Sequence, residues 1–190
     1  MLIPSINGHP LDTPMRSVRS GQEDAADVIL NPGDFHFYCP IPGRPGPARV
    51  LTLLGSCVSF VVWHPGRGIG CMSHGVLPAR SRRGAGVALA ARFCDEAVIL
   101  LQNELNRVGI LAQQCQAYLV GGGRMYQSSS NAQSIGDCNI EMSRDSLQQA
   151  GFVITAQHVG KEGYRKVALD LRSGEIVVTV ANNRITLRRA

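Results

Sequence analysis

A stretch that predicts a tight antiparallel hairpin constrains the fold of this chain more than any other: residues 52–78, TLLGSCVSFVVWHPGRGIGCMSHGVLP. Two runs of β-forming residues, Val58–Trp63 and Ile69–Leu77, are separated by a connection that contains proline and glycine, His64–Arg67. Such a connection between two such runs is typical of a β-hairpin. We therefore expect the two strands to be antiparallel neighbours in one sheet.

The pairing of this hairpin brings a thiol and an imidazole together. With a four-residue connection, Trp63 faces Gly68, and further along the two strands Cys57 faces His74. Directly opposed residues point to the same face of a sheet, with Cβ atoms roughly 4.5–5.5 Å apart. We predict that the sulfur of Cys57 and the ring of His74 lie within hydrogen-bond reach. A slip of one residue would place them on opposite faces.

This pair is a candidate for nucleophilic catalysis. A cysteine with the ordinary pKa of about 8.5 is only about 3% thiolate at neutral pH, and an imidazole that takes its proton raises that population. Gly55 and Ser56 precede Cys57, and a glycine bend there can aim a backbone N–H at a developing oxyanion. The alternative is a structural cysteine, because cysteine is among the most buried residue types and Gly-Ser-Cys alone is not specific.

The rest of the chain carries helix and strand patterns. Apolar residues at helical spacing predict a helix over residues 87–108, and a second helix over 139–150 with Asp137 or Asn139 as its N-cap. Further strands are expected at 35–39, 114–120, 152–156, 164–171 and 175–180. These elements predict an α+β fold, with packed β-sheets in a sandwich-like core flanked by the two helices.

Residues 29–190 are expected to form a single domain. Residues 1–28 carry no periodic apolar pattern and are expected to be a loosely ordered extension. The first ten residues lack the charged start and apolar run of a secretory signal, and no apolar run reaches the roughly 18 residues of a membrane helix. We therefore expect a cytoplasmic protein whose six cysteines are reduced.

Metal, cofactor and nucleic-acid sites are not expected. The cysteines form no Cys-x-x-Cys pair, and no two histidines stand at the spacing of metal ligands. Gly121–Gly123 lacks the Gly-Lys-Ser/Thr ending of a phosphate-binding loop, so a tight turn or a close backbone approach explains it. The net charge is +5, but aromatic residues are only 5% and the arginines are dispersed, which argues against nucleic-acid binding.

Three arginines follow His74 closely: Arg80, Arg82 and Arg83. A basic segment beside a catalytic pair can guide an acidic partner toward it, in a way that weakens with salt. The alternative is a solvated loop without a role in binding. Both interpretations stay open on the sequence alone.

Several segments, in this order, resemble the chemoreceptor glutamine deamidase family, CheD. They are Thr52–Val58 with Gly70–Pro78, Arg92–Ala97, Gly121–Met125, Ile135–Asn139 and Tyr164–Val167. The resemblance covers roughly residues 30–180, and its specificity lies in the order of the segments. Two departures are mild: Cys71 stands where a small residue is usual, and His64 where an acidic residue is common.

The resemblance implies a cysteine hydrolase that converts glutamine side chains of methyl-accepting chemotaxis receptors to glutamate through a thioester. It maps the catalytic triad onto Cys57 as nucleophile, His74 as acid and base, and Thr52 as the residue that orients the imidazole. Glutamyl methyl esters present the same acyl carbon, so methylesterase activity is chemically compatible with this site. The resemblance also implies a CheC-type phosphatase as a partner. A non-catalytic regulatory adaptor that binds receptors or that phosphatase remains the alternative.

Overall fold

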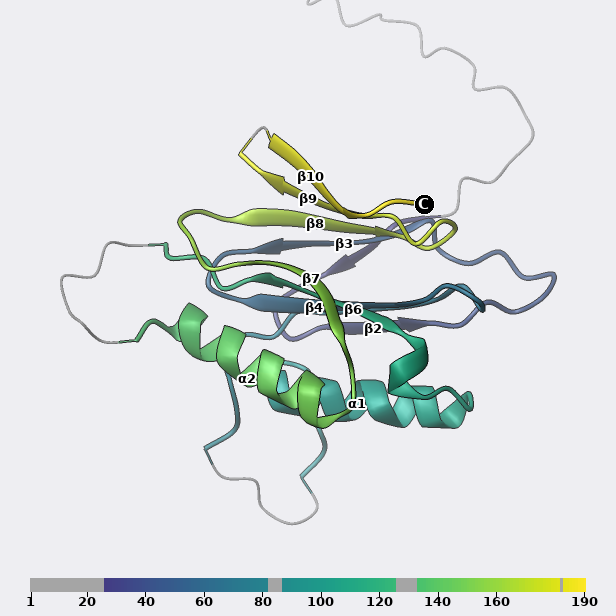
Figure 1. Cartoon of the computed structure of the whole chain (residues 1–190), viewed down its shortest axis with the longest axis horizontal. Helices are drawn as coiled ribbons and strands as arrows, with labels where there is room; N and C mark the ends of the chain where they lie inside the picture. Colours follow the sequence, from purple (N-terminus) through teal and green to yellow (C-terminus); the bar gives the residue numbers. More distant parts are fainter. Residues whose placement is uncertain (1–25, 82–86, 126–132, 182) are drawn as a thin grey trace, which may run out of the picture.

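The computed structural model describes residues 26–81, 87–125, 133–181 and 183–190. Within them the chain forms three layers: a first β-sheet, a second β-sheet, and two helices that lie against the second sheet (Figure 1). The expected α+β class with packed sheets is confirmed, and both helices lie on the same side of the sandwich. Residues 1–25 of the expected extension lie outside the described residues.

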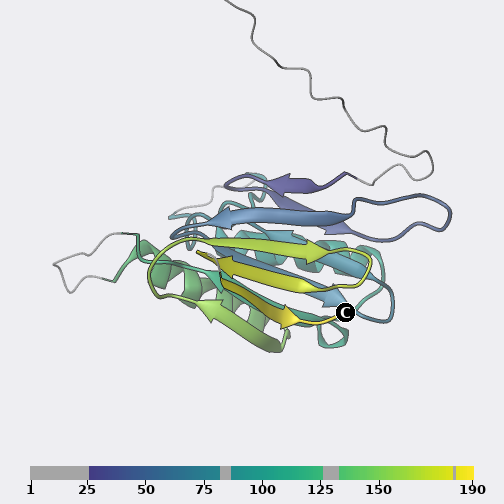
Figure 2. The ribbon, with the colours of Figure 1, turned by 90° about the horizontal axis from the view of Figure 1, so that it is seen from above.

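Each sheet has five strands. Sheet A has the order β1 (Val28–Leu30), β3 (Arg49–Leu54), β8 (Arg165–Asp170), β9 (Ile176–Val180) and β10 (Asn183–Arg188). Sheet B has the order β2 (Phe35–Tyr38), β5 (Ile69–Ser73), β4 (Val58–His64), β6 (Gln116–Gly121) and β7 (Ile154–Val159). The β1–β3 and β6–β7 pairs are parallel and the other pairs are antiparallel. Figure 2, seen from above, shows sheet A with no helix over its outer face.

Sheet B is the middle layer, and strand β4 shows why its sequence is apolar throughout. Val58, Phe60 and Val62 pack with the helices, whereas Val61 and Trp63 pack against sheet A. Side chains alternate between the faces of a strand, so a strand with a layer on each side must be apolar at both sets of positions. The near-continuous apolar run of the hairpin is therefore explained by its central position.

Strand β3 has only one covered face. Val50, Thr52 and Leu54 are buried toward sheet B, and Leu53 is 54% exposed on the outer face. This alternation places a polar residue, Thr52, in a row of inward-facing apolar positions. Strand β3 thus carries Thr52 to the interface between the two sheets.

Helix α1 (Cys94–Arg107) begins later than the helix expected from residue 87. Residues 91 and 92 form a turn and Phe93 is extended: the carbonyl of Arg92 accepts hydrogen bonds from the N–H groups of Val76 and Leu77, and Phe93 bridges to Leu77. The backbone of residues 92 and 93 is therefore hydrogen-bonded to the segment that follows the hairpin and cannot be helical. The expectation of a helix over residues 87–93 was therefore wrong.

Helix α2 (Ile135–Gln149) begins earlier than expected, because Ser134 is its N-cap. The Ser134 hydroxyl accepts a hydrogen bond from the N–H of Asp137 at 3.1 Å, and the Asp137 carboxylate accepts from the Ser134 N–H at 3.3 Å. This reciprocal capping box fixes the first turn. Of the described helices, neither is long and apolar enough to cross a membrane.

The hairpin forms, but its register differs from the predicted one. Trp63 pairs with Gly70 and His64 with Ile69, so β4 extends one residue further into the turn than expected, whereas β5 begins at Ile69 as expected. Gly68 has a φ of 60°, a turn conformation that cannot begin a strand, and the carbonyl of His64 accepts a hydrogen bond from the N–H of Arg67. The prediction that Cys57 lies directly opposite His74 was therefore wrong, because the register is shifted by two residues.

Candidate functional site

The imidazole of His74 is oriented by strands β1 and β3. The hydroxyl oxygen of Thr52 lies 2.8 Å from Nδ1 of His74 and 3.0 Å from the carbonyl oxygen of Leu30. A carbonyl can only accept, so the single hydroxyl hydrogen of Thr52 goes to Leu30, and the hydroxyl oxygen accepts the proton on Nδ1. In the neutral ring this tautomer leaves Nε2 with a free lone pair.

The backbone of His74 is held as firmly as its ring. The N–H of His74 donates to the carbonyl of Asp34 at 2.9 Å, and the N–H of Gly33 donates to the carbonyl of His74 at 2.8 Å. Both partners belong to the turn at residues 31–34. The residue is only 3% exposed. Burial lowers the pKa of His74, although the Leu30 carbonyl and the Asp34 charge act in the opposite direction, so the ring is neutral at pH 7.

The loop that carries Cys57 is fixed through three consecutive carbonyls. The carbonyl of Gly55 accepts from the N–H of Gly123 at 2.7 Å, and that of Cys57 accepts from the N–H of Gly122 at 2.8 Å. The carbonyl of Ser56, between them, accepts from Nδ2 of Asn139 at 3.1 Å. Gly55 and Ser56 therefore lie in a loop in which the carbonyls of residues 55, 56 and 57 each accept a hydrogen bond, and their support of an oxyanion stays a prediction.

The glycines after strand β6 are required by this close approach. A Cβ on Gly121 would lie 2.3 Å from the carbonyl oxygen of Cys57, and one on Gly123 would lie 3.1 Å from that of Gly55. Real Cβ atoms do not come as close as 2.3 Å to a backbone oxygen. The expected explanation of Gly121–Gly123 as a close backbone approach is thus confirmed, and the partner of this segment is the cysteine loop.

Cys57 and His74 stand on either side of one backbone pair. Val58 and Gly75 exchange two hydrogen bonds of 2.9 and 2.8 Å, Cys57 precedes Val58, and His74 precedes Gly75. In antiparallel pairing these two residues are diagonal neighbours, for which Cβ atoms are roughly 7–8 Å apart or somewhat closer. An imidazole is long enough to reach across such a diagonal. The change of register by two keeps both residues on one face.

Cys57 is partly exposed, and its burial raises the pKa of its thiol, while its own backbone N–H acts to lower it. With the pKa of His74 lowered as well, the resting pair is a neutral thiol and a neutral imidazole. The sequence predicted a thiolate populated by the histidine before substrate arrives. The raised pKa of Cys57 and the lowered pKa of His74 favour a different order, in which the proton moves to Nε2 of His74 as the sulfur attacks.

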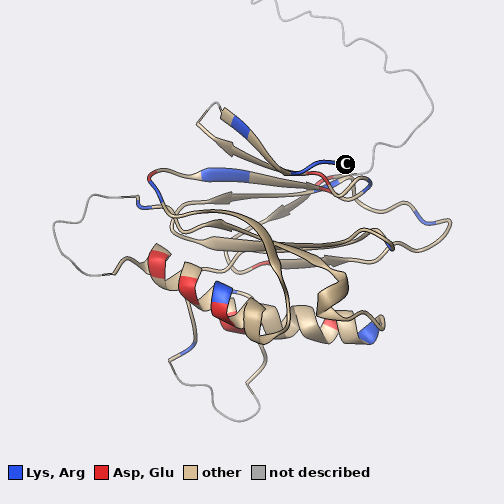
Figure 3. Ribbon diagram, in the orientation of Figure 1, with Lys and Arg blue, Asp and Glu red and all other residues tan. Residues whose placement is uncertain are grey.

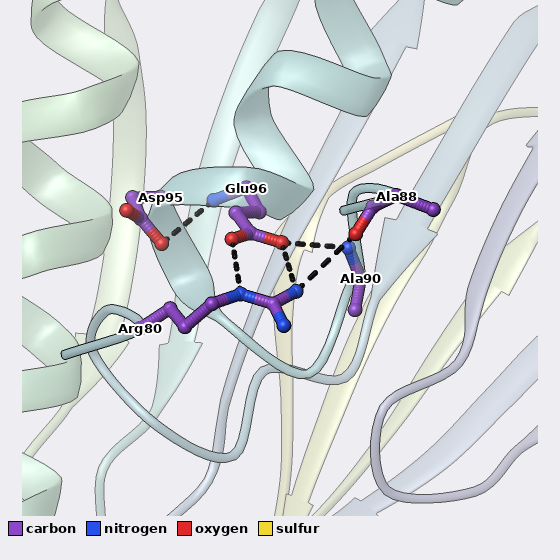
Figure 4. Close-up of polar contacts among 5 residues, drawn as sticks. All are labelled: Arg80, Ala88, Ala90, Asp95 and Glu96. Carbon is purple, nitrogen blue, oxygen red and sulfur yellow. Dashed lines mark hydrogen bonds and ion pairs between the residues drawn. The ribbon is translucent and has the colours of Figure 1, made fainter. Parts of the chain in front are cut away.

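Arg80 is engaged in an ion pair rather than directed to solvent. Its Nε and one terminal nitrogen each lie 2.9 Å from a carboxylate oxygen of Glu96, which is 3% exposed, and Glu96 also accepts from the N–H of Ala90 (Figure 4). The guanidinium also lies 4.6 Å from the centre of the Phe93 ring. Glu96 balances the charge of Arg80, and guidance of a substrate by this arginine stays a prediction. Arg82 and Arg83 lie outside the described residues.

The described charged residues and cysteines outside this site are spread over several elements. Acidic residues gather along α2, and basic residues lie on β8 and β10 of sheet A (Figure 3). Within the described ranges, no three His, Cys, Asp or Glu side chains are grouped so as to hold a metal ion. All six cysteines are free thiols, and burial raises the pKa values of Cys94 and Cys115 to about 11.

Sequence reasoning missed two partners of this site. The carbonyl of Leu30 decides the tautomer of His74, but a backbone group has no sequence signature. Asn139 was considered only as a helix cap, whereas its side chain is fully buried against the Ser56 and Val76 carbonyls. An asparagine on the apolar side of a predicted helix was the available signal, since buried amides normally have hydrogen-bond partners.

Comparison with known proteins gives one consistent result. The family model described as CheD chemotactic sensory transduction matches residues 76–180. The chain is 33% identical to "Probable chemoreceptor glutamine deamidase CheD 2" of Albidiferax ferrireducens, over 83% of this chain and 88% of that protein. It is 37% identical to "Probable chemoreceptor glutamine deamidase CheD 3" of Dechloromonas aromatica, over 79% of this chain and 85% of that protein. It is 31% identical to "Probable chemoreceptor glutamine deamidase CheD" of Methanococcus vannielii, over 72% of this chain and 87% of that protein.

Proposed function

The chain belongs to the CheD family, and on this premise we propose that it is a protein-glutamine deamidase that hydrolyses glutamine side chains of chemoreceptors to glutamate. Cys57 is the nucleophile, His74 is the general base and acid, and Thr52 orients the imidazole. The observation that carries this proposal is the contact between the Thr52 hydroxyl and Nδ1 of His74, which leaves Nε2 free to accept a proton.

The first half of the reaction forms a thioester. As the thiol of Cys57 passes its proton to Nε2 of His74, sulfur attacks the carboxamide carbon and the C=O electron pair moves to oxygen. The backbone N–H of Cys57 is the candidate donor to this oxyanion. When the intermediate collapses, the C–N bond breaks, His74 returns the proton to nitrogen, and ammonia leaves.

The second half regenerates the thiol. His74 takes a proton from a water molecule as the water oxygen attacks the thioester carbon. The C–S bond then breaks as the carboxyl group forms, and His74 returns the proton to the sulfur of Cys57. The net change is one amide and one water converted to a carboxylate and ammonium. A glutamyl methyl ester would pass through the same thioester with methanol as the leaving group, so we include receptor methylesterase activity in the proposal.

The substrate we infer is the cytoplasmic helical part of a methyl-accepting chemotaxis receptor, which places the protein in the cytoplasm. The relatives are named for action on chemoreceptors, and this supports the assignment. A CheC-type phosphatase is the regulatory partner that we propose. We propose that the arginines that follow His74, Arg80, Arg82 and Arg83, guide the acidic receptor toward the site and take no part in the chemistry.

The test is a mass measurement on a receptor fragment. Purified protein is incubated with the cytoplasmic fragment of a chemoreceptor, and peptides are searched for the mass increase that replaces an amide by a carboxyl group. We expect this increase at defined glutamines, complete loss in Cys57→Ala and His74→Ala, and full activity in Cys39→Ala. Cys39 is a matched control because it is also a partly exposed free thiol.

Two outcomes would contradict the proposal. Deamidation that persists in Cys57→Ala would assign the nucleophile elsewhere. Tight binding of receptor fragments without any mass change, across several receptors, would support the adaptor alternative in place of the enzyme.

A further inference from the structure

Asn139 holds the middle carbonyl of the cysteine loop. Its side chain is 0% exposed, and Nδ2 donates to the carbonyl of Ser56 at 3.1 Å and to that of Val76 at 3.0 Å. The flanking carbonyls of Gly55 and Cys57 are bound by backbone N–H groups. The Ser56 carbonyl is therefore the only one of the three whose position depends on a side chain.

The Ser56 carbonyl belongs to the same peptide unit as the N–H of Cys57. The structure has no cis peptide bond among its described residues, and in a trans peptide the C=O and N–H point in opposite directions. A side chain of α2 that fixes this carbonyl therefore turns the Cys57 N–H away from α2. That N–H lies against the thiol of its own residue, where it acts to lower the thiol pKa.

The second acceptor joins the cysteine to the histidine. Val76 follows His74 by two residues, in the segment whose Gly75 pairs with Val58. One amide nitrogen thus connects the loop that carries Cys57 with the segment that carries His74. Two donors on one atom are needed for this, and an amide side chain supplies them.

The surroundings of the Asn139 oxygen agree with the orientation of the amide in which Nδ2 donates to both carbonyls. Its Oδ1 is buried and has no hydrogen-bond partner among the described residues. Exchange of oxygen and nitrogen would place Oδ1 against two carbonyl oxygens, so the two acceptors fix the orientation. A buried acceptor without a partner is unfavourable, and the fold tolerates it at the residue that touches both catalytic segments.

We propose that Asn139 is a positioning residue that aims the Cys57 N–H at the oxyanion and fixes the cysteine loop to the His74 segment. This inference rests on the proposed function, because it assigns a role in the same reaction. It requires that Asn139 affect the step in which negative charge develops on oxygen. It also requires that the intrinsic reactivity of the thiol be largely unaffected.

The experiment separates these two quantities with small probes that need no receptor. The probe p-nitrophenyl acetate acylates Cys57 through an oxyanion: the S–C bond forms, the C–O bond between the acetyl carbon and the phenolate oxygen breaks, and p-nitrophenolate leaves as a measurable burst. Iodoacetamide alkylates the same sulfur with loss of iodide and develops no oxyanion. Both rates are measured in Asn139→Asp, which keeps the shape of the side chain, and in Asn139→Ala. Asn103→Asp is the matched control on an exposed face of α1.

We expect the acylation rate to fall about 10- to 100-fold in both Asn139 variants, less than deletion of an oxyanion donor causes, because the N–H is misdirected but present. We expect alkylation of Cys57 to change by less than about 3-fold and Asn103→Asp to match the wild type. Acylation at the wild-type rate, or a parallel fall of both rates, would overturn the positioning role. Failure of both variants to fold would do so too, because it would assign Asn139 to the stability of the fold.

The receptor assay keeps this result separate from the proposed function. An acylation defect in the variants, together with a wild type that deamidates no receptor, would contradict the substrate and retain the positioning role. Receptor deamidation by the wild type, with an unchanged burst in the variants, would contradict the positioning role alone.

Discussion

Thr52 performs with a neutral hydroxyl a task that acidic residues perform in other triads. The group next to a catalytic histidine selects the tautomer and stabilises the imidazolium. Thr52 can select the tautomer, because its hydroxyl hydrogen is donated to the Leu30 carbonyl and its hydroxyl oxygen faces Nδ1 of His74. Thr52 stabilises the imidazolium only weakly, since a hydroxyl carries no charge. The burial that lowers the His74 pKa fits a ring that is protonated only during the reaction.

Removal of this hydroxyl should therefore slow the chemical step without weakening substrate binding. In a serine protease, loss of the correct tautomer lowers kcat by about 10⁴, and a neutral partner contributes less. We predict that Thr52→Val lowers kcat about 10- to 100-fold with little change in KM. Thr52→Ser should retain most of the activity. Deamidation kinetics on a receptor fragment provide the measurement.

Thr179→Val is the control for a threonine elsewhere in sheet A, on strand β9. It should leave kcat unchanged. Equal activity of Thr52→Val and the wild type would show that the hydroxyl does not set the tautomer. A greater loss in Thr52→Val than in His74→Ala would reverse the roles assigned to the two residues.

At the scale of elements, the apolar pattern of the sequence predicted the layers of the fold better than it predicted where individual strands and helices begin and end. The run of β4 is apolar on both faces because the strand lies between two layers, and this was recognisable in the sequence. Strands β1 and β10 were missed: β1 has three residues, and β10 is largely exposed and polar. Strand β3 was missed although Val50, Thr52 and Leu54 alternate as an amphipathic strand should.

The candidate site could be predicted only in part. The residues Thr52, Cys57 and His74 could be chosen from a family resemblance, but the hairpin register depended on the conformation of Gly68 in the turn. The link from Asn139 to Ser56 spans 83 positions of the chain. No local pattern specifies such a contact, because it depends on how α2 packs against the end of sheet B.

This packing depends on two glycines in contact. A Cβ on Gly136 of α2 would lie 2.8 Å from the carbonyl oxygen of Gly122, whose N–H holds the Cys57 carbonyl. We predict that Gly136→Ala destabilises the fold by about 1–3 kcal/mol through overpacking, offset in part by the higher helix propensity of alanine. It should also lower activity, because α2 carries Asn139. Thermal unfolding and deamidation kinetics measure the two effects.

Gly66→Ala is the matched control. A Cβ there would meet only the end of the His64 ring, at 3.3 Å, so the side chain can move aside. We expect its thermal midpoint to stay close to that of the wild type. A Gly136→Ala protein with unchanged stability and activity would refute the idea that the approach of α2 to Gly122 sets the site.

At the scale of the whole molecule, one side-chain contact ties the two sheets together near the site. Arg165 of β8 in sheet A is 0% exposed and donates from Nε to Nδ1 of His158, on β7 of sheet B, at 3.0 Å. Its other nitrogens donate to the carbonyls of Gly160 and Gly163. Among the described residues its hydrogen-bond acceptors are neutral, so His158 must stay unprotonated to accept.

These groups make the free energy of unfolding depend on pH on both sides of neutrality. Burial lowers the pKa values of His36, His74 and His158, and Arg165 and Lys161 lower that of His158 further. Below about pH 6.5 the unfolded chain therefore binds protons that the folded chain does not, and stability falls as the pH falls. Above about pH 8.5 the thiols of Cys94 and Cys115 ionise only when the chain unfolds, and stability falls as the pH rises.

We therefore predict that the thermal midpoint is highest between about pH 6.5 and 8.5 and falls toward pH 5.5. Carboxylates act at lower pH: the pKa values of Asp27, Asp137 and Asp170 are lowered in the folded state, so the stability that they contribute is lost only below about pH 5. His158→Gln keeps an acceptor for Arg165 without a titrating ring, so it should make the fall toward acid pH measurably smaller. Calorimetric scans at half-unit steps of pH test this. A fall of the same size in His158→Gln as in the wild type would exclude His158 as a contributor and would leave the bridge between the sheets insensitive to its protonation.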